Sequence, residues 1–322
     1  MKCAPILLLG FNRPDLIRQQ IANIAPYKPS KVFFAVDGWR NEEEKVLCEA
    51  TRAAVELINW PCELKTYFRD ENRGCRNAPP EAITWFFNAV ESGIVLEDDC
   101  HPAPGFIDFA TELLELYKDD ERIGAIAAFN RHNFQTDKKF SYHFSKDLNI
   151  WAWASWRRVW KDYDVTMTRY LDGIDDMIER HTKNRRMRRY WHNSFQGVLS
   201  GTIVTWDYQF SCMFMMRGYL CVRPSERLVA NKGIGGIAAT HTGGYDFWAK
   251  DFSTAGNIFF PLKHPPRVEV DTMADVKTER VVTGIVPWVI WVVGSVLPRP
   301  FRPVVTLAGR ILYAIAPWLF EL

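Results

Sequence analysis

The sequence lacks the features that mark several classes of protein. Its formal net charge is only +2, so no overall field draws the chain toward nucleic acid. It contains no internal repeat and no low-complexity tract. The run Met1–Gly10 is too short and too poorly flanked to be a leader peptide, and we expect a strand there. With 48% hydrophobic and 24% charged residues, the composition is that of a globular protein, which excludes disorder.

Cysteine pairing is also missing. The chain has seven cysteines, an odd number, and no two of them have the C-x-x-C spacing. Neither a structural zinc site nor a framework of disulfides is indicated. We therefore expect a protein of the reducing cytoplasm.

What the first half does contain is a regular alternation of apolar runs and amphipathic segments. Strands are expected at 5–9, 31–36, 62–68, 93–96 and 123–128, and helices at 14–24, 78–90 and 106–117. A further helix is expected between the first two of these, with the capping-box spacing of Asn41 and Glu44 at its start and an apolar period from Leu47 to Ile58. This alternation predicts an α/β fold with a mostly parallel central sheet flanked by helices. After about residue 130 the pattern loosens into long loops and aromatic residues.

Three adjacent acids follow the fourth expected strand. Glu97, Asp98 and Asp99 come directly after the buried run 94–96. In an open parallel sheet, ligands bind beyond the carboxyl ends of the strands. Neighbouring carboxylates repel one another unless a cation compensates them, and Mg²⁺ or Mn²⁺ prefers such oxygen ligands. If the strand continued, Glu97 and Asp99 would point to one side. A solvated acidic turn is the alternative.

The residues around these acids resemble a known family. The stretch 96–109 is similar to the acidic metal motif and following helix of inverting GT-A glycosyltransferases, of the N-acetylglucosaminyltransferase I type and the family 2-like type. Gly10–Arg13, Val36–Gly38 and Trp206–Asp207 match further motifs in the same order. The likeness covers roughly residues 4 to 245 and implies a GT-A, Rossmann-like fold.

The resemblance also implies roles for individual residues. Arg13 and Asp37 would contact the nucleotide of a nucleotide-sugar donor, with Asp37 near the base or ribose. Asp98 would approach the ribose, and Glu97 would lie beside it at the donor. Asp99 would be the direct ligand of Mn²⁺ or Mg²⁺, which would bridge the donor's diphosphate. The alternatives are a surface charge for Arg13 and a plain Asp-Gly turn for Asp37.

A loop before the third helix resembles the donor-side loop of family 2-like enzymes. It runs from Arg69 to Ala78 and contains the Asn-x-Gly pattern as Asn72 and Gly74. Glycine permits a close backbone approach, and the amino end of a helix attracts phosphate. A turn with a solvated basic face is the alternative.

The candidate for the catalytic base lies far downstream. Asp207 looks like the family's catalytic acid, which takes the proton of the acceptor hydroxyl. Relatives often have two adjacent acids there, whereas this chain has Tyr208 in the second position. The base could thus lie one residue away or elsewhere, and an aspartate that caps a helix is the alternative.

Aromatic residues and one histidine complete the candidate site. Trp151, Trp153 and Trp156 are expected to share one face of a strand and to stack on an acceptor sugar, a tryptophan-rich core strand being the alternative. His241 lies in the glycine-rich stretch 239–244 and is a second metal candidate, although a lone histidine can equally be structural.

The remaining signals concern a membrane. Basic residues crowd the stretch 180–189, and the apolar stretches 281–298 and 304–320 follow. Basic clusters bind anionic lipid, and an apolar tail with flanking Arg and Trp suits the interface. We expect peripheral association with the cytoplasmic face of the cell membrane, with a hairpin or span, a packed subdomain or a homodimer interface as alternatives. No recognised nucleic-acid fold accompanies the basic stretch.

Together these patterns predict a GT-A domain over 1–270, with a donor half (1–130) and an acceptor half (131–270), and an apolar C-terminal segment over 271–322. The expected activity is metal-dependent, inverting transfer from a nucleotide sugar, expected to be UDP-linked, to a saccharide or lipid-linked glycan. The rivals are a sugar-phosphate nucleotidyltransferase and a non-catalytic membrane-associated scaffold that keeps the fold.

Overall fold

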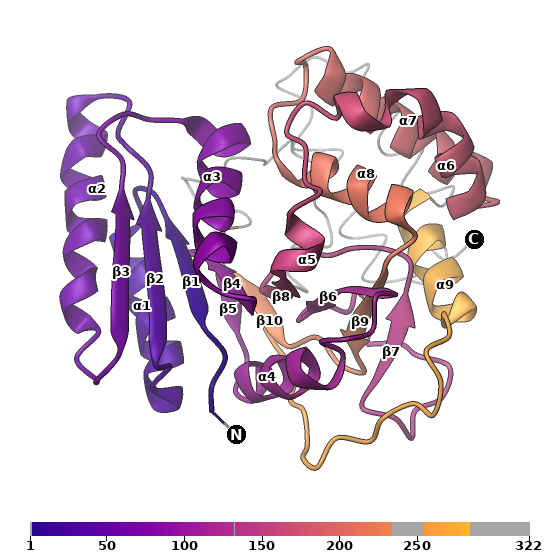
Figure 1. The fold of residues 1–322 in the computed structure, drawn as a ribbon, viewed down its shortest axis with the longest axis horizontal. Coiled ribbons are helices and arrows are strands. Elements are labelled where there is room, and N and C mark those ends of the chain that lie inside the picture. The colour runs from indigo at the N-terminus through magenta and orange to yellow at the C-terminus, as the bar shows by residue number, and fades with distance from the viewer. Residues whose placement is uncertain (1, 132, 234–253, 284–322) are drawn as a thin grey trace, which may run out of the picture.

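A computed structural model of the chain describes residues 2–131, 133–233 and 254–283. Within these ranges a sheet of eight strands runs through the molecule, with helices on both faces (Figure 1). The helices are α1 (Pro14–Ile24), α2 (Glu42–Ala53), α3 (Gly74–Ala89), α4 (Phe106–Leu116), α5 (Arg157–Trp160), α6 (Ile174–His181), α7 (Arg185–Leu199), α8 (Asp207–Arg217) and α9 (Thr272–Thr283), with short 3-10 turns at Ala25–Tyr27, Ala54–Leu57 and Thr168–Gly173.

The strand order in the main sheet is β3-β2-β1-β4-β8-β6-β9-β7. The strands are β1 (Ile6–Gly10), β2 (Lys31–Val36), β3 (Glu63–Phe68), β4 (Ser92–Glu97), β6 (Ile123–Ala127), β7 (Tyr142–Ser145), β8 (Trp153–Trp156) and β9 (Leu220–Pro224). The first four pair in parallel, as predicted. β8 and β7 are antiparallel to their neighbours, so the sheet is mixed although mostly parallel.

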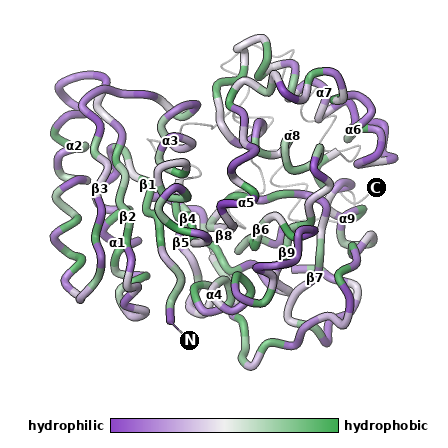
Figure 2. The backbone as a smooth tube through the Cα atoms, viewed as in Figure 1, coloured by the Kyte–Doolittle hydropathy of each residue, from purple (hydrophilic) through white to green (hydrophobic). Residues whose placement is uncertain are grey.

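The alternation of side chains along β2 shows which helices cover each face. Phe33 packs edge-on against Phe86 of α3, at 5.0 Å between ring centroids. Phe34, the next residue, is buried on the other face, where its ring and Thr51 of α2 both lie next to Gly10. A strand buried on both faces needs apolar residues at every position, and Lys31–Val36 has five buried ones in a row. Figure 2 shows the same contrast, with green along the central strands and mixed colours along the helices.

The structure differs from the sequence-based expectation at the start of α3 and in an additional small sheet. Helix α3 begins at Gly74, four residues before the predicted start, and includes Pro79 and Pro80. The two prolines are the sixth and seventh residues of the helix, beyond the first four residues whose N–H groups have no partner within a helix, so each proline removes one backbone hydrogen bond of α3. A second, two-stranded sheet was not predicted: β5 (Cys100–Pro102) pairs antiparallel with β10 (Val229–Asn231).

The two predicted halves share one sheet, because β7, β8 and β9 all come from residues after 130. Helix α9, at the start of the predicted C-terminal segment, packs on α7 and β7 of this body. The apolar stretch 304–320 and most of 281–298 lie outside the described residues. None of the helices in the described ranges has the length and apolar character needed to cross a bilayer.

A buried histidine in β7 gives a prediction about stability and pH. Burial lowers the pKa of His143 to about 4 from its usual 6.5; Arg223 on the paired strand lowers it further, while Asp271 opposes the shift. The folded state thus binds fewer protons at this site than the unfolded state between pH 4 and 6.5. The stabilising contribution is complete above pH 6.5 and is lost as the pH falls through this window, up to about 3 kcal/mol.

Replacing His143 with glutamine removes this titration. As the pH falls from 6.5 to about 4, we expect the unfolding free energy of the wild type to decrease relative to that of His143→Gln, by about 1.4 kcal/mol per pH unit. Urea unfolding of both proteins at several pH values measures it. Other groups, such as Asp275, titrate in both proteins and cancel in the difference. Parallel stability curves for the two proteins would contradict the assignment.

Candidate active site

The candidate site lies where the order of the strands reverses. From β1 the chain moves outward on one side through β2 and β3, and then returns to place β4 on the other side of β1. The ends of these strands are level, because Gly10 pairs with Val36 and Leu9 pairs with Glu97. The carboxyl edge at such a reversal is the usual ligand crevice of an open α/β sheet.

The acidic turn is built at this edge by β4 and β5. Glu97 is the last residue of β4, Asp98 and Asp99 form a turn, and Cys100 begins β5. The strand therefore stops at Glu97 instead of continuing. Gln20 from α1 fixes the turn, because its side-chain amide donates to the carbonyls of Glu97 (2.9 Å) and Cys100 (2.8 Å).

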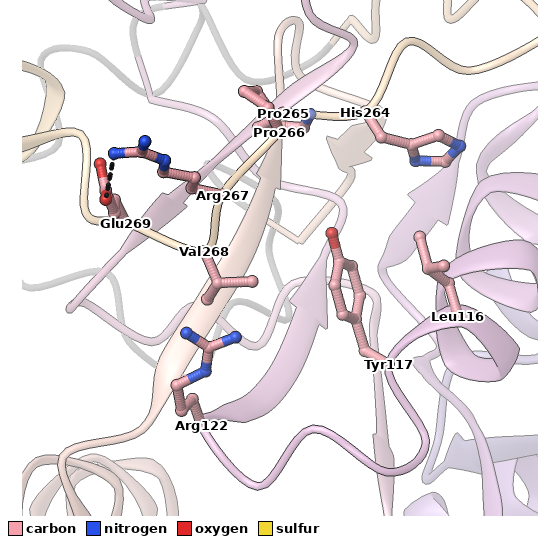
Figure 3. Close-up of a pocket in the computed structure, with 9 residues that line it drawn as sticks. All are labelled: Leu116, Tyr117, Arg122, His264, Pro265, Pro266, Arg267, Val268 and Glu269. Carbon is pink, nitrogen blue, oxygen red and sulfur yellow. Dashed lines mark ion pairs between the residues drawn. The ribbon is translucent and has the colours of Figure 1, made fainter.

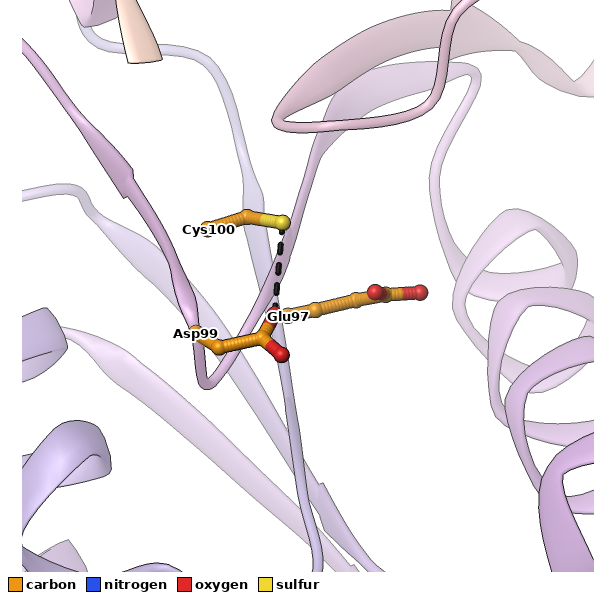
Figure 4. A group of neighbouring side chains, drawn as sticks. All are labelled: Glu97, Asp99 and Cys100. Atoms are coloured by element: carbon orange, nitrogen blue, oxygen red, sulfur yellow. Dashed lines mark hydrogen bonds between the residues drawn. The ribbon is translucent and has the colours of Figure 1, made fainter. Parts of the chain in front are cut away.

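Side chains of the turn converge even though the strand ends. One ligand atom each from Glu97, Asp99 and Cys100 lies within 4.8 Å of the others (Figure 4). Burial and the carboxylates of Asp99, Glu97 and Asp98 raise the pKa of the Cys100 thiol well above 9.0, so it stays protonated near neutral pH. The donor set is thus one of carboxylate oxygens, which suits Mg²⁺ or Mn²⁺.

Electrostatics at the turn indicate uncompensated negative charge. Burial, Asp99, Asp98 and Asp207 together raise the pKa of Glu97 well above its usual value. Burial and Asp99 likewise raise the pKa of Asp98 to about 7, although Arg13 opposes the shift. These shifts mean that burial first, and then the neighbouring carboxylates, destabilise the charged forms, and a divalent cation bound there would favour them.

Arg13 neutralises part of this charge. Its Nη1 lies 3.1 Å from Asp98 Oδ1 and 2.8 Å from Asp99 Oδ2. The Arg13 side chain is 16% exposed, so these ion pairs lie at the edge of the protein interior. The sequence predicted a nucleotide contact for Arg13; in this structure it contacts the predicted metal ligand.

Asp37 organises the predicted donor loop. Its carboxylate accepts hydrogen bonds from the backbone N–H of Arg73 (3.0 Å) and Gly74 (3.0 Å) and from Asn72 Nδ2 (3.1 Å). Gly74, with φ +71, is the first residue of α3. An aspartate that follows β2 thus caps the amino end of α3 and holds Asn72 and Gly74 beside the crevice.

The structure brings Asp207 close to this cluster from 110 residues away in the chain (207 minus 97). It is the first residue of α8, and its charge contributes to the raised pKa of Glu97, after burial and the two neighbouring aspartates. Its Oδ1 accepts hydrogen bonds from the Tyr208 N–H (2.9 Å) and the Thr205 hydroxyl. These two donors fix the orientation of the carboxylate.

Tryptophans 151, 153 and 156 do not share a face, and that expectation is wrong. Trp153 and Trp156 differ by three positions in β8, so they point to opposite faces of the sheet. Trp153 is fully buried against Phe210 of α8, and Trp156 donates its indole N–H to Leu114 of α4. Both therefore belong to the core, and only Trp151 is part-exposed.

His241 lies outside the described residues. Residues 231–233, which we call the strap, contact the acidic turn. Lys232 N donates to the Asp99 carbonyl (2.8 Å), and Gly233 N donates to Asn231 Oδ1 (2.9 Å). Gln20 and this strap were missed as site residues, because a buried glutamine and a short polar segment carry no signal in the sequence.

Gly233 fits against the Asp99 carboxylate, because a Cβ at this position would collide with Asp99 Oδ2. We expect Gly233→Ala to displace either the strap or the carboxylate and to weaken Mn²⁺ binding about 10- to 100-fold, as does loss of a residue that supports a metal ligand. Titration of Mn²⁺ followed by electron paramagnetic resonance measures this.

Gly173→Ala is the matched control. Its new Cβ would meet the end of the flexible Met216 side chain at 2.9 Å, far from the acidic turn. It should bind Mn²⁺ like the wild type. If the two variants bind Mn²⁺ with equal affinity, the strap has no role in metal binding.

A separate pocket of about 570 Å³ is lined by Arg122, directly before β6, and by residues of two other segments (Figure 3). It contains none of the predicted site residues, and its cations already have acidic partners: Arg122 pairs with Asp120, and Arg267 with Glu269. The pocket lies between the end of α4 and the segment 264–269. The chemistry therefore concentrates at the carboxyl edge and not in this pocket.

Comparisons with known proteins do not assign the chain to a family. No protein-family model matches it, and no curated protein matches it. Among solved structures, it is similar to the crystal structure of HddC from Yersinia pseudotuberculosis, with 8% sequence identity, a TM-score of 0.32, and coverage of 50% of this chain and 80% of that chain. A TM-score this low supports no inference about fold or function.

Proposed function

We propose that this protein is a metal-dependent, inverting glycosyltransferase with a GT-A fold, which transfers a sugar from a nucleotide sugar to a saccharide or lipid-linked acceptor. The observation that carries the proposal is that the acidic turn lies at the strand reversal, with Asp207 near enough to Glu97 for its charge to help raise the pKa of that carboxyl. The three acids are suited to bind a metal ion beside a diphosphate, and Asp207 is suited to accept a proton.

In the proposed site, Asp99 and Glu97 would hold Mn²⁺ or Mg²⁺, which when bound supplies positive charge to a departing diphosphate. Arg13 is within reach of the same charge, because it already pairs with Asp99. These groups stabilise the negative charge that develops on the leaving group. Gly74 and Asn72 would act through Asp37, because the Gly74 N–H and the Asn72 side-chain amide already donate to its carboxylate and hold it beside the crevice.

Asp207 would act on the acceptor. The acceptor hydroxyl oxygen forms a bond to the anomeric carbon, the bond from that carbon to the diphosphate oxygen breaks, and the hydroxyl proton passes to the Asp207 carboxylate. Attack opposite to the leaving group inverts the configuration. Trp151, two residues before β8, is the one of the three predicted tryptophans that is part-exposed, and it is the one that would contact an acceptor sugar.

Binding of a panel of nucleotide sugars tests the proposal. Purified full-length protein is titrated with UDP-, GDP-, CMP- and dTDP-sugars in the presence of Mn²⁺, Mg²⁺ or a chelator. We expect metal-dependent binding, or slow hydrolysis, of one donor. A sugar-phosphate nucleotidyltransferase would instead release pyrophosphate from a nucleoside triphosphate, and folded protein that binds no donor would favour the scaffold.

A further inference from the structure

The amino end of α7 carries charges that do not help the helix. Arg185, Arg186 and Arg189 are exposed there, Lys183 precedes them, and the first turn contains no acid. Cations at the positive end of a helix dipole are unfavourable. The helix is stabilised by other means, since the Asn184 side chain accepts from the N–H of Arg186 (3.0 Å) and an apolar stripe is buried.

Acidic neighbours offset only part of this charge. Glu179 of α6 pairs with Arg188 at 3.6 Å, and Asp175 of α6 approaches His192 at 3.8 Å. Asp176 adds a third acid on α6. We define the basic face as the exposed cations at this end of α7 and the last turn of α9: Lys183, Arg185, Arg186, Arg189 and Arg280.

Helix α9 ends beside the basic face. Asn184 Nδ2 donates to Thr283 Oγ1 (3.1 Å), and Arg186 Nη1 donates to the Thr283 carbonyl (3.4 Å). The helix itself is fixed to the body, because the Ser145 hydroxyl donates to Asp275 Oδ1 (2.6 Å). The end of α9 is therefore held next to the cations at the start of α7.

The sequence that follows Thr283 contains no charged residue until Arg299. A basic face alone would attract any polyanion, but a basic face at the root of a long uncharged apolar segment matches a bilayer with an anionic surface. Headgroups attract the cations, while the acyl region accepts apolar side chains. A nucleic acid would offer the apolar residues nothing.

We propose that the basic face is a docking surface for an anionic phospholipid bilayer. Helix α7 also borders the candidate site: the hydroxyl of Tyr190 lies 2.9 Å from that of Tyr208, the neighbour of Asp207. Docking through α7 would thus place the acceptor side of the crevice near the membrane. The inference itself does not rest on the proposed glycosyltransferase activity.

Co-sedimentation of the full-length protein with vesicles tests the docking surface. The vesicles contain phosphatidylcholine alone or phosphatidylcholine with phosphatidylglycerol. We expect binding to the anionic vesicles to be tighter and to weaken with salt. The combined variant Lys183→Gln, Arg185→Gln and Arg189→Gln should bind them roughly a hundredfold more weakly, at roughly fivefold per charge.

A control variant with the same loss of charge elsewhere, Arg18→Gln, Lys28→Gln and Lys65→Gln, should bind like the wild type. If both variants bind the anionic vesicles equally weakly, binding depends only on the net charge of the protein and the proposal is overturned. Equal binding of the wild type to neutral and anionic vesicles would also overturn it, as would salt-sensitive binding to DNA without binding to vesicles. Donor binding, measured separately without lipid, reports on the proposed activity and not on docking.

Discussion

Replacing Asp99 with asparagine is expected to abolish metal-dependent donor binding. Asparagine keeps the size of the side chain and an oxygen that can face Arg13, but it removes the charge that a divalent ion needs. Loss of a residue that only supports a metal ligand costs about 10- to 100-fold in metal affinity, so loss of the ligand should cost at least about a hundredfold. Calorimetric titration of a UDP-sugar with Mn²⁺, or with chelator, measures the effect.

Asp15→Asn is the control for this experiment. Asp15 also forms an ion pair with an arginine, Arg18, but its side chain is 86% exposed on α1. The control should bind the donor and Mn²⁺ like the wild type. If Asp99→Asn binds a donor with the same affinity and the same dependence on metal as the wild type, Asp99 is not the metal ligand and the proposed donor site is wrong.

The second large effect is expected at Asp207. Asparagine cannot take a proton from the acceptor, yet its oxygen can still accept from Tyr208 N–H and the Thr205 hydroxyl. We therefore expect Asp207→Asn to lower kcat about 10²- to 10⁴-fold, the usual contribution of a general base, with unchanged donor affinity. Single-turnover transfer with saturating donor measures it, once the donor panel has identified a substrate.

Comparison with Asp207→Ala separates catalysis from capping. If Asp207 only stabilises the start of α8, the asparagine variant keeps its activity, since asparagine is a good cap, and the alanine variant loses about 1 kcal/mol of stability. If Asp207 is the base, both variants lose transfer, and the asparagine variant unfolds at the wild-type urea concentration. The two outcomes cannot be confused, because one appears in the rate and the other in the stability.

Most helices and strands of residues 1–130 could be predicted from the sequence because their signals are local. A buried strand such as Lys31–Val36 needs a continuous apolar run, and the acids after β4 stand out against that run. The α/β class and the four parallel strands were predicted correctly. The start of α3 was not, because Asp37, which caps it, follows β2 and lies 37 residues earlier in the chain than Gly74, beyond the reach of any local pattern.

The strands after residue 130 were harder to predict from the sequence because they are short and pair with distant partners. β8 has four residues and lies between β4 and β6, antiparallel to both. Three tryptophans close together suggested one aromatic face, but the spacing of Trp153 and Trp156 puts them on opposite faces. The structure buries both, so their aromatic character serves packing and not an accessible surface.

The sequence by itself determined the α/β class and the acidic run at a strand end, because periodicity is a local property, and the resemblance to GT-A glycosyltransferases added Arg13, Asp99 and Asp207 as candidates. Only the tertiary structure decided which of these residues meet. Strand pairing set Arg13 against Asp99, and the packing of α8 on the sheet brought the charge of Asp207 to Glu97. Such contacts depend on the order of strands in space, which no window of sequence contains.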